Sequence, residues 1–219
     1  MKIFLTLICF SFLYLNITAQ EKNHQPKIGL TLSGGGAKGF AHIGILKAID
    51  SAGLKIDYIT GTSMGAIVGA LYATGYSGND IENLRKNIDF DLLFSNNVPL
   101  QTLSMEEKEQ YSRFAIELPV IKNKIKLQTG LISGQELNLK FSELFFPVYN
   151  IRNFDSLPIP FKCMATDLET GDLVVLDTGN INTALRATMA IPSVFSAVAR
   201  DGKRLVDGGL VRNFPVKNV

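Results

Sequence analysis

The chain is poor in cysteine, in histidine and in any excess of one charge, and each shortage narrows its possible functions. Its 219 residues include two cysteines, two histidines, and 22 basic against 20 acidic residues, for a formal net charge of +2. Lys and Arg are spread among the acids, so no nucleic-acid partner is expected. With 46% hydrophobic and 19% charged residues the chain is not a disordered polymer, and its length suits one α/β domain with a buried core.

The N-terminal segment, which contains one of the two cysteines, has the pattern of a signal peptide. A lysine precedes the apolar run from Ile3 to Leu15, and small residues follow it. The run is short for a membrane span, so we predict a signal peptide over residues 1–19 and an exported protein, located in the periplasm, in the outer membrane or secreted. An uncleaved anchor or a buried helix is the alternative. Cleavage removes Cys9 and leaves Cys163 alone, so no intrachain disulfide is expected.

Strands and helices alternate in the next part of the chain. Residues 20–26 predict a short polar linker that leads into one domain over residues 27–219. The predicted elements are a buried strand at 27–32, a glycine-rich loop, a helix over 40–52, a strand at 55–60 and a helix over 66–75. This order predicts a parallel α/β sheet with right-handed crossovers.

The remainder of the chain mixes helices with strands that follow one another closely. Residues 80–109 look helical but irregular, and residues 113–130 suggest a hairpin. Ser133 with Glu136 predicts a capping box before a helix that Pro147 closes. The last predicted elements are strands at 161–168 and 172–179, a short helix over 182–192, and two strands around a turn at 200–203.

The stretch GTSMG, from Gly61 to Gly65, has the form G-x-S-x-G and falls between a predicted strand and a predicted helix. A serine hydroxyl is a weak nucleophile at neutral pH, so it must be exposed, oriented and deprotonated to attack a carbonyl. The flanking glycines allow a sharp turn that places Ser63 at a helix N-terminus, where negative charge is favoured. Ser63 is therefore a candidate nucleophile, and an N-cap serine in a glycine-rich bend is the alternative.

The stretch SGGGAKGF is the second candidate element. Gly34, Gly36 and Gly39 fit G-x-G-x-x-G, a pattern typical of dinucleotide binding. That interpretation needs an acidic residue at the far end of the next strand, whereas Asp57 lies at its start and the far end runs into GTSMG. Backbone amides in this loop instead suit the oxyanion of a tetrahedral intermediate. Lys38 either adds positive charge there or faces solvent.

The scarcity of histidine directs the search for a base to the carboxylates. His24 lies in the linker, and His42, at an apolar helix start, is expected to pack or cap rather than to act as the base. In VDGG, Asp207 is followed by Gly208 and Gly209, which leave its carboxylate accessible to another part of the chain. A β-turn is the alternative, although the Asp-Gly pair between the two last predicted strands is the better turn candidate.

The chain resembles the patatin-like phospholipases in three motifs that occur in this order: SGGGAKG, GTSMG and VDGG. Together with the predicted signal peptide, the resemblance suggests a bacterial, exported member. The resemblance extends to AHIGIL, ATDLETG, ATMAIPSVF and NFPV, and covers nearly the whole predicted domain. It implies a three-layer α/β/α sandwich with a mostly parallel central sheet. It also implies that Ser63 is the nucleophile and Asp207 its partner in a dyad without histidine. The family's oxyanion region corresponds to Gly34, Gly35, Gly36, Lys38 and Gly39, and the motif glycines to Gly61, Gly65, Gly208 and Gly209.

The resemblance implies a serine lipid acyl hydrolase, of the phospholipase A or lysophospholipase type, that forms an acyl-enzyme and needs no metal or other cofactor. The expected partners are a lipid ester and, transiently, a membrane surface. Phe90–Leu93 and Leu144–Val148 either border an acyl pocket or contact the membrane, or they are ordinary core. A non-enzymatic nucleotide-binding or scaffold domain is the alternative, and an inactive relative is a third possibility.

The dyad raises one physical difficulty, because a free aspartate with a pKa of about 3.9 is a feeble base at neutral pH. Burial and close contact with the serine would make it a better one. We therefore expect the Asp207 carboxylate to lie within hydrogen-bond reach of Ser63 Oγ. The family's domain normally continues further beyond DGG, so the chain is also expected to be a fragment or a truncated member.

Overall fold

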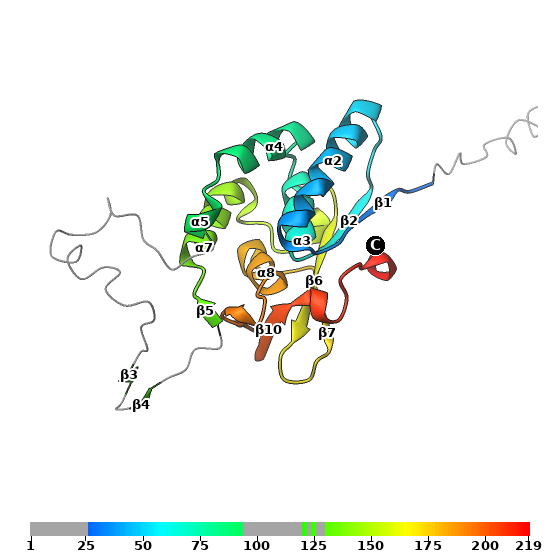
Figure 1. Cartoon of the computed structure of the whole chain (residues 1–219). Coiled ribbons are helices and arrows are strands. Elements are labelled where there is room, and N and C mark those ends of the chain that lie inside the picture. Colours follow the sequence, from blue (N-terminus) through cyan, green and yellow to red (C-terminus); the bar gives the residue numbers. More distant parts are fainter. Residues whose placement is uncertain (1–25, 94–119, 122–123, 126–129) are drawn as a thin grey trace, which may run out of the picture.

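The computed structural model describes residues 26–93, 120–121, 124–125 and 130–219 (Figure 1). The predicted signal peptide and all but the last residue of the predicted linker lie outside the described residues, as does the part of the irregular helical region beyond residue 93. Within the described ranges, no helix is both long enough and apolar enough to cross a bilayer.

A six-stranded sheet forms the centre of the fold. Its strands are β1 (Gly29–Leu32), β2 (Tyr58–Thr62), β6 (Phe161–Asp167), β7 (Leu173–Leu176), β9 (Val198–Arg200) and β10 (Lys203–Asp207). The order is β1-β2-β6-β10-β9, and β7 also pairs with β6. β1, β2 and β6 run parallel, while β7, β9 and β10 join antiparallel. The α/β class is therefore confirmed, with β1, β2 and β6 as adjacent parallel strands.

Two small sheets accompany it. β3 (Val120–Ile121) and β4 (Lys124–Ile125) pair antiparallel, which confirms the predicted hairpin at the residues that are described. β5 (Gly130–Ile132) and β8 (Ser193–Phe195) pair in parallel.

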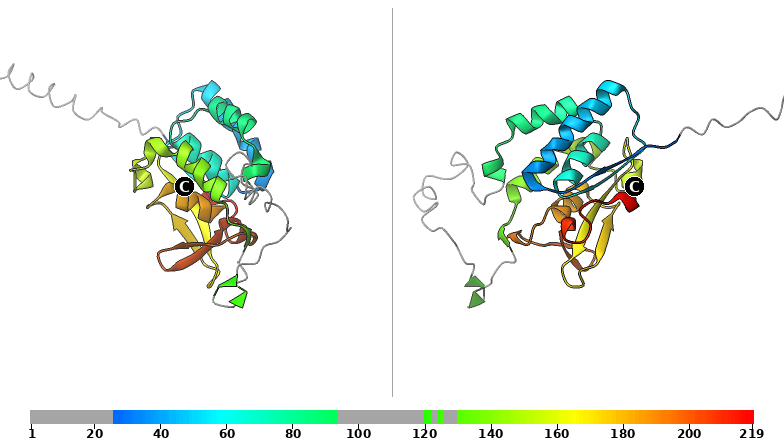
Figure 2. Two further views of the ribbon diagram at one scale, coloured as in Figure 1. Left: turned by 90° about the vertical axis from the view of Figure 1, so that its left-hand side faces the viewer. Right: turned by 45° about the vertical axis from the view of Figure 1, so that its right-hand side comes forward.

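Helices α2, α3 and α4 lie together beside β1 and β2 (Figures 1 and 2). The helices are α2 (Ala41–Ala52), α3 (Met64–Ala73), α4 (Gly78–Asn87), α5 (Phe90–Leu93), α7 (Gln135–Leu144) and α8 (Ile181–Thr188). The 3-10 turns are η1 (Gly36–Phe40), η3 (Phe146–Val148), η4 (Phe154–Ser156), η5 (Gly208–Leu210) and η6 (Val216–Asn218). α2 ends as predicted at Gly53, whose left-handed φ of 63° stops the helix.

α3 is the central helix of this layer, and its sequence explains its position. It is apolar all round, so nearly all of it is buried, and it packs on β1, β2 and β6. A Cβ at Gly69 would lie 3.0 Å from the Ile59 side chain, so this glycine lets the helix approach the sheet closely. The N-terminus of α3 therefore has a well-determined position directly after the end of β2.

The opposite face of β2 is covered by the C-terminal segment rather than by a helix of the described part. Thr62 Oγ1 donates to the Arg212 carbonyl at 2.9 Å, and Thr60 Oγ1 contacts the Pro215 carbonyl at 3.4 Å. The helix layer that the resemblance implied on a second face is represented here by the short turns η5 and η6 and the segment that joins them.

The predicted capping box of Ser133 and Glu136 is wrong. α7 begins at Gln135, and its N-cap is Gly134, with a left-handed φ of 70° and no side-chain cap. The Ser133 carbonyl accepts a hydrogen bond from Arg186 at 2.8 Å, and a Cβ at Gly134 would lie 2.6 Å from the guanidinium carbon of Arg186. Packing against Arg186 therefore determines where this helix starts. The helix ends at Leu144, before Pro147, which lies in the turn η3.

Candidate active site

Ser63 lies in the sharp bend between β2 and α3, as predicted. Its φ of 52° and ψ of −127° are rare for a residue with a side chain and cost about 1–3 kcal/mol. The bend closes only because its neighbours are glycines. A Cβ at Gly61 would lie 2.6 Å from the Ala66 Cα, and one at Gly65 would overlap the Leu32 and Ser33 carbonyl oxygens.

Asp207 lies at the end of β10 and meets Ser63 directly. Ser63 Oγ donates a hydrogen bond to Asp207 Oδ2 at 2.7 Å, which confirms the predicted contact. The Gly209 amide donates to the other carboxylate oxygen, Oδ1, also at 2.7 Å. Both side chains are buried, with 7% of each residue exposed.

The environment of Asp207 favours its protonated form. Burial raises the pKa of this carboxyl group, and the hydrogen bonds from Ser63 and Gly209 lower it by less. His42 takes no part in this contact, because its Nε2 bonds the Ser33 carbonyl at 2.9 Å. His42 is therefore packed against the backbone, as expected.

Buried threonines hold the backbones of both residues. The Ser63 amide donates to Thr188 Oγ1 at 3.0 Å, and Thr166 Oγ1 donates to the Asp207 carbonyl at 3.0 Å. No sequence pattern indicated a role for these two threonines. They lie in the blocks ATMAIPSVF and ATDLETG, which carry the family resemblance but have no chemical pattern of their own.

The glycine-rich loop runs beside Ser63. A Cβ at Gly34 would lie 2.9 Å from the Ser63 Cβ. The Gly34 amide donates to the Asn213 carbonyl at 3.3 Å, and Asn213 Nδ2 donates to the Gly34 carbonyl at 3.3 Å. Because the Gly34 amide is engaged, it is less suited to an oxyanion than predicted. Asn213 is a further residue of the site, and it lies in the NFPV block.

The amides of Gly35 and Gly36 precede the first hydrogen bond of η1, which runs from the Lys38 amide to the Gly35 carbonyl at 3.2 Å. Helix-initial amides have no partner within their own helix, so these two remain the candidates for a role at the oxyanion. Gly36 has a φ of 55° and open space where a Cβ would be. Lys38 is exposed, and Gly39 is buried against Met64.

A hollow of about 460 Å³ opens beside Ser63. Apart from Ser63 itself, the described residues that line it are all apolar: Gly36, Ala37, Phe40, Met64, Ile67, Phe90, Ile132, Met189, Ile191, Val194 and Phe195. Phe90 thus borders the hollow, as one interpretation of its segment predicted. The segment Leu144–Val148 does not contribute to the lining; three of its residues are buried, and Phe146 is 75% exposed.

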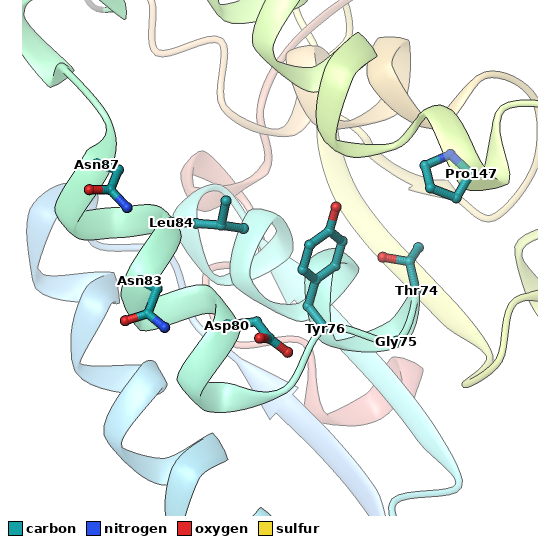
Figure 3. A pocket seen from close by; sticks show the side chains of 8 residues that line it. All are labelled: Thr74, Gly75, Tyr76, Asp80, Asn83, Leu84, Asn87 and Pro147. Atoms are coloured by element: carbon teal, nitrogen blue, oxygen red, sulfur yellow. The ribbon is translucent and has the colours of Figure 1, made fainter.

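A second hollow, which neither Ser63 nor Asp207 lines, lies between α4 and the turn that contains Pro147 (Figure 3). It is lined by Thr74, Gly75, Tyr76, Asp80, Asn83, Leu84, Asn87 and Pro147. The one carboxylate among these residues, Asp80, caps α4 through Ser77. The described residues of this hollow therefore offer no pair of nucleophile and base. In the described part of the chain, no group of three or more His, Cys, Asp or Glu side chains could hold a metal ion.

Comparison with known proteins identifies proteins whose sequences are similar to this chain. An uncharacterized NTE family protein of Mycobacterium tuberculosis is 29% identical over 191 residues, which cover 87% of this chain and 45% of the relative. Neuropathy target esterase sws of Drosophila melanogaster is 30% identical over 190 residues, 86% of this chain and 12% of the relative. The chain thus spans less than half the length of these curated relatives.

Among solved structures, VipD from Legionella pneumophila matches with a TM-score of 0.55 at 17% identity, over 87% of this chain and 47% of VipD. At this identity the likeness concerns the fold alone. The family model described as patatin-like phospholipase matches residues 30–219, a range that includes the Ser63 bend, the glycine-rich loop and Asp207. With a match of this extent, the chain belongs to the patatin-like phospholipase family.

Proposed function

We propose that the protein is a serine lipid acyl hydrolase in which Ser63 and Asp207 form the catalytic dyad. The observation that carries this proposal is the 2.7 Å hydrogen bond from Ser63 Oγ to Asp207 Oδ2 at the wall of an apolar hollow. The family's description as phospholipases and a relative's name as an esterase support a lipid ester as the substrate.

The first half of the reaction forms an acyl-enzyme. Ser63 Oγ attacks the ester carbonyl carbon while Asp207 Oδ2 takes the hydroxyl proton. The carbonyl oxygen becomes an oxyanion, which the Gly35 and Gly36 amides stabilise, and one such donor typically contributes about 3 kcal/mol. The intermediate collapses as the C–O bond to the alcohol breaks, and Asp207 returns its proton to the leaving oxygen.

The second half releases the fatty acid. Water attacks the acyl carbon, Asp207 takes a proton from it, and the second tetrahedral intermediate expels Ser63 Oγ, which recovers the proton. A carboxylate can act in this way because burial raises the pKa of Asp207 and so makes it a stronger base than a solvated aspartate. The apolar hollow beside Ser63 would hold the acyl chain, since the residues that line it in the described part of the chain are apolar apart from the nucleophile.

A fluorescent fluorophosphonate tests the nucleophile, because it reacts with activated serines. We expect labelling of the wild-type protein, none for Ser63→Ala, and a large loss for Asp207→Asn. Ser51→Ala is the matched control, because Ser51 lies on the exposed side of α2 and its Oγ bonds the Lys47 carbonyl. Equal labelling of wild type and Ser63→Ala would refute the proposal. NAD or ATP binding without labelling would favour the alternative of a nucleotide-binding domain.

Substrate class and location complete the proposal. Hydrolysis of phospholipid, lysophospholipid and short-chain ester substrates, presented both in vesicles and in solution, shows whether a lipid surface is required. We propose that residues 1–19 direct export and are removed, leaving the linker and the domain over residues 27–219. N-terminal sequencing of the exported protein checks the cleavage site, and retention of the intact N-terminus in the cytoplasm would contradict it.

A further inference from the structure

One short segment at the end of α8 bonds the backbones of both candidate catalytic residues. The Ser63 amide donates to Thr188 Oγ1 at 3.0 Å, and the Asp207 amide donates to the Ala190 carbonyl at 2.9 Å. Ser63 and Asp207 are 144 positions apart in the chain. The segment from Thr188 to Ala190 therefore connects two residues that no local sequence feature brings together.

The direction of both hydrogen bonds at Thr188 is unambiguous. A hydroxyl has one proton to donate, and it accepts through its lone pairs. The Ser63 amide can only donate, so Thr188 Oγ1 accepts from it and donates its own proton to the Met164 carbonyl. Thr188 is fully buried, so no solvent replaces either partner.

The Met164 carbonyl also lies against the backbone that follows Asp207. A Cβ at Gly208 would overlap the carbonyl oxygen of Met164, so the backbone directly after Asp207 packs against the group that Thr188 bonds. Met164 lies in β6, and one edge of β6 pairs first with β2, which leads into Ser63, and then with β10, which ends at Asp207, while β7 pairs with its other edge. Thr188 thus bonds the backbone of the nucleophile and the strand along which β2 and β10 meet.

We propose that Thr188 is a positioning residue for acyl transfer, a role that rests on the proposed function. Its hydroxyl fixes the Ser63 amide and so holds the rare backbone conformation of that residue, with φ at 52°. The same contact sets the direction of Ser63 Oγ toward Asp207. Valine has the shape of threonine but can neither accept from the amide nor donate to Met164, whereas serine can do both.

The experiment compares Thr188→Val with Thr188→Ser, and uses Thr60→Val as a matched control. Thr60 is also a fully buried threonine, but its hydroxyl contacts Thr31 and the Pro215 carbonyl rather than either member of the dyad. The measurements are kcat and KM on an ester substrate, the rate of fluorophosphonate labelling, and the thermal unfolding midpoint.

For Thr188→Val we expect kcat and the labelling rate to fall about a hundredfold with little change in KM, as misplacement of reacting atoms predicts. Thr188→Ser should restore both to within about threefold of wild type, because it keeps both hydrogen bonds. Thr60→Val should lower the unfolding midpoint as Thr188→Val does and leave kcat within about threefold. If Thr188→Val and Thr60→Val have the same kcat, or if serine does not restore activity, the inference is overturned.

Hydrogen exchange at the Ser63 amide separates this inference from the proposed function. The amide should exchange slowly in wild type and in Thr188→Ser, and at least about tenfold faster in Thr188→Val. If the wild-type protein neither hydrolyses esters nor reacts with the fluorophosphonate, the proposed function fails, and unchanged exchange would separately refute the contact. Thr188→Ala takes the place of Thr188→Val under the same criteria if the valine variant does not unfold cooperatively.

Discussion

Ser63 Oγ donates to Asp207 Oδ2 at 2.7 Å, so the two residues already stand in the geometry that a proton transfer between them requires. No side chain needs to move to bring them together. Burial raises the pKa of Asp207, so its carboxylate is a stronger base than an aspartate in water.

The first prediction concerns the pH dependence of catalysis. If Asp207 is the base, kcat/KM falls as pH decreases through the pKa of Asp207 in the folded protein, because the protonated carboxyl cannot accept the serine proton. Since burial raises this pKa, the midpoint of the acid limb should lie above the ordinary value of 3.8. Steady-state kinetics across acidic pH measure it. Full activity at and below pH 3.8 would contradict the assignment.

The second prediction is that Asp207→Asn makes the protein more stable at neutral pH while it removes activity. A carboxyl whose pKa is raised by folding contributes its stability below its unfolded pKa and loses it as pH rises through the folded pKa. At pH 7, which lies above the unfolded value of 3.8, this stability is reduced, whereas a neutral amide of the same shape does not titrate and keeps its stability. A gain of about 1 kcal/mol would raise Tm by about 2–4 °C.

Thermal unfolding of both proteins at several pH values checks the sign. The difference in Tm should shrink as pH falls through the folded-state pKa of Asp207 to 3.8, and stay constant below that value, where Asp207 is protonated in both the folded and the unfolded state. A lower Tm for Asp207→Asn at pH 7 would show that the carboxylate stabilises the fold.

The third prediction concerns the contact between the glycine-rich loop and the nucleophile. In Gly34→Ala the new Cβ would lie 2.7 Å from Asn213 Oδ1 and 2.9 Å from the Ser63 Cβ, so the loop or Ser63 must shift. We expect kcat to fall at least about a hundredfold, as misplacement of about 1 Å predicts.

Gly44→Ala is the matched control, because Gly44 lies in α2 with open space where the Cβ would be. That variant should keep its activity and gain about 0.5–1 kcal/mol of stability, since alanine is the better helix former. Enzyme assays with unfolding curves distinguish the two. Wild-type activity in Gly34→Ala would show that the loop does not bear on the reaction.

The fourth prediction concerns the length of the acyl chain. Phe40, Met64, Ile67 and Phe90 line both the hollow beside Ser63 and a smaller apolar hollow of about 50 Å³. The rings of Phe40 and Phe90 meet edge to face, with their centroids 5.1 Å apart. Phe90→Ala removes one of these rings and joins the two hollows, so the preference should move toward longer acyl chains.

Competition between ester substrates of increasing chain length gives the ratio of their kcat/KM values directly. Phe146→Ala is the matched control, because Phe146 is 75% exposed and lines neither hollow. An unchanged chain-length profile in Phe90→Ala would show that the acyl chain does not occupy this hollow.

The contact between Ser63 and Asp207 could be predicted because each residue lies in a short motif that resembles one of the patatin-like phospholipases. The supporting contacts could not. Asn213 bonds Gly34 from 179 positions away, and Thr188 is separated from Ser63 by 125. Their residue types have no pattern that announces these roles, since asparagine and threonine are common in turns and at helix ends.

The start of α7 shows the opposite failure, in which a recognisable local signal does not form. Ser133 and Glu136 have the spacing of a capping box, but Gly134 takes a left-handed conformation against the buried Arg186. A tertiary contact with a side chain 53 positions away therefore prevails over a local signal of about 1 kcal/mol. The order of the strands in the sheet could not be predicted from the sequence either, because no local pattern indicates that β10 pairs with β6 or that this pairing is antiparallel.

The bridge between Gly34 and Asn213 has a consequence for the order in which this arrangement can assemble during synthesis. A ribosome translates Asp207 144 residues after Ser63, and Asn213 179 residues after Gly34. A nascent chain therefore contains the sharp bend and the glycine-rich loop long before it contains the residues that bond them, so neither contact can form until both parts of the chain have been made.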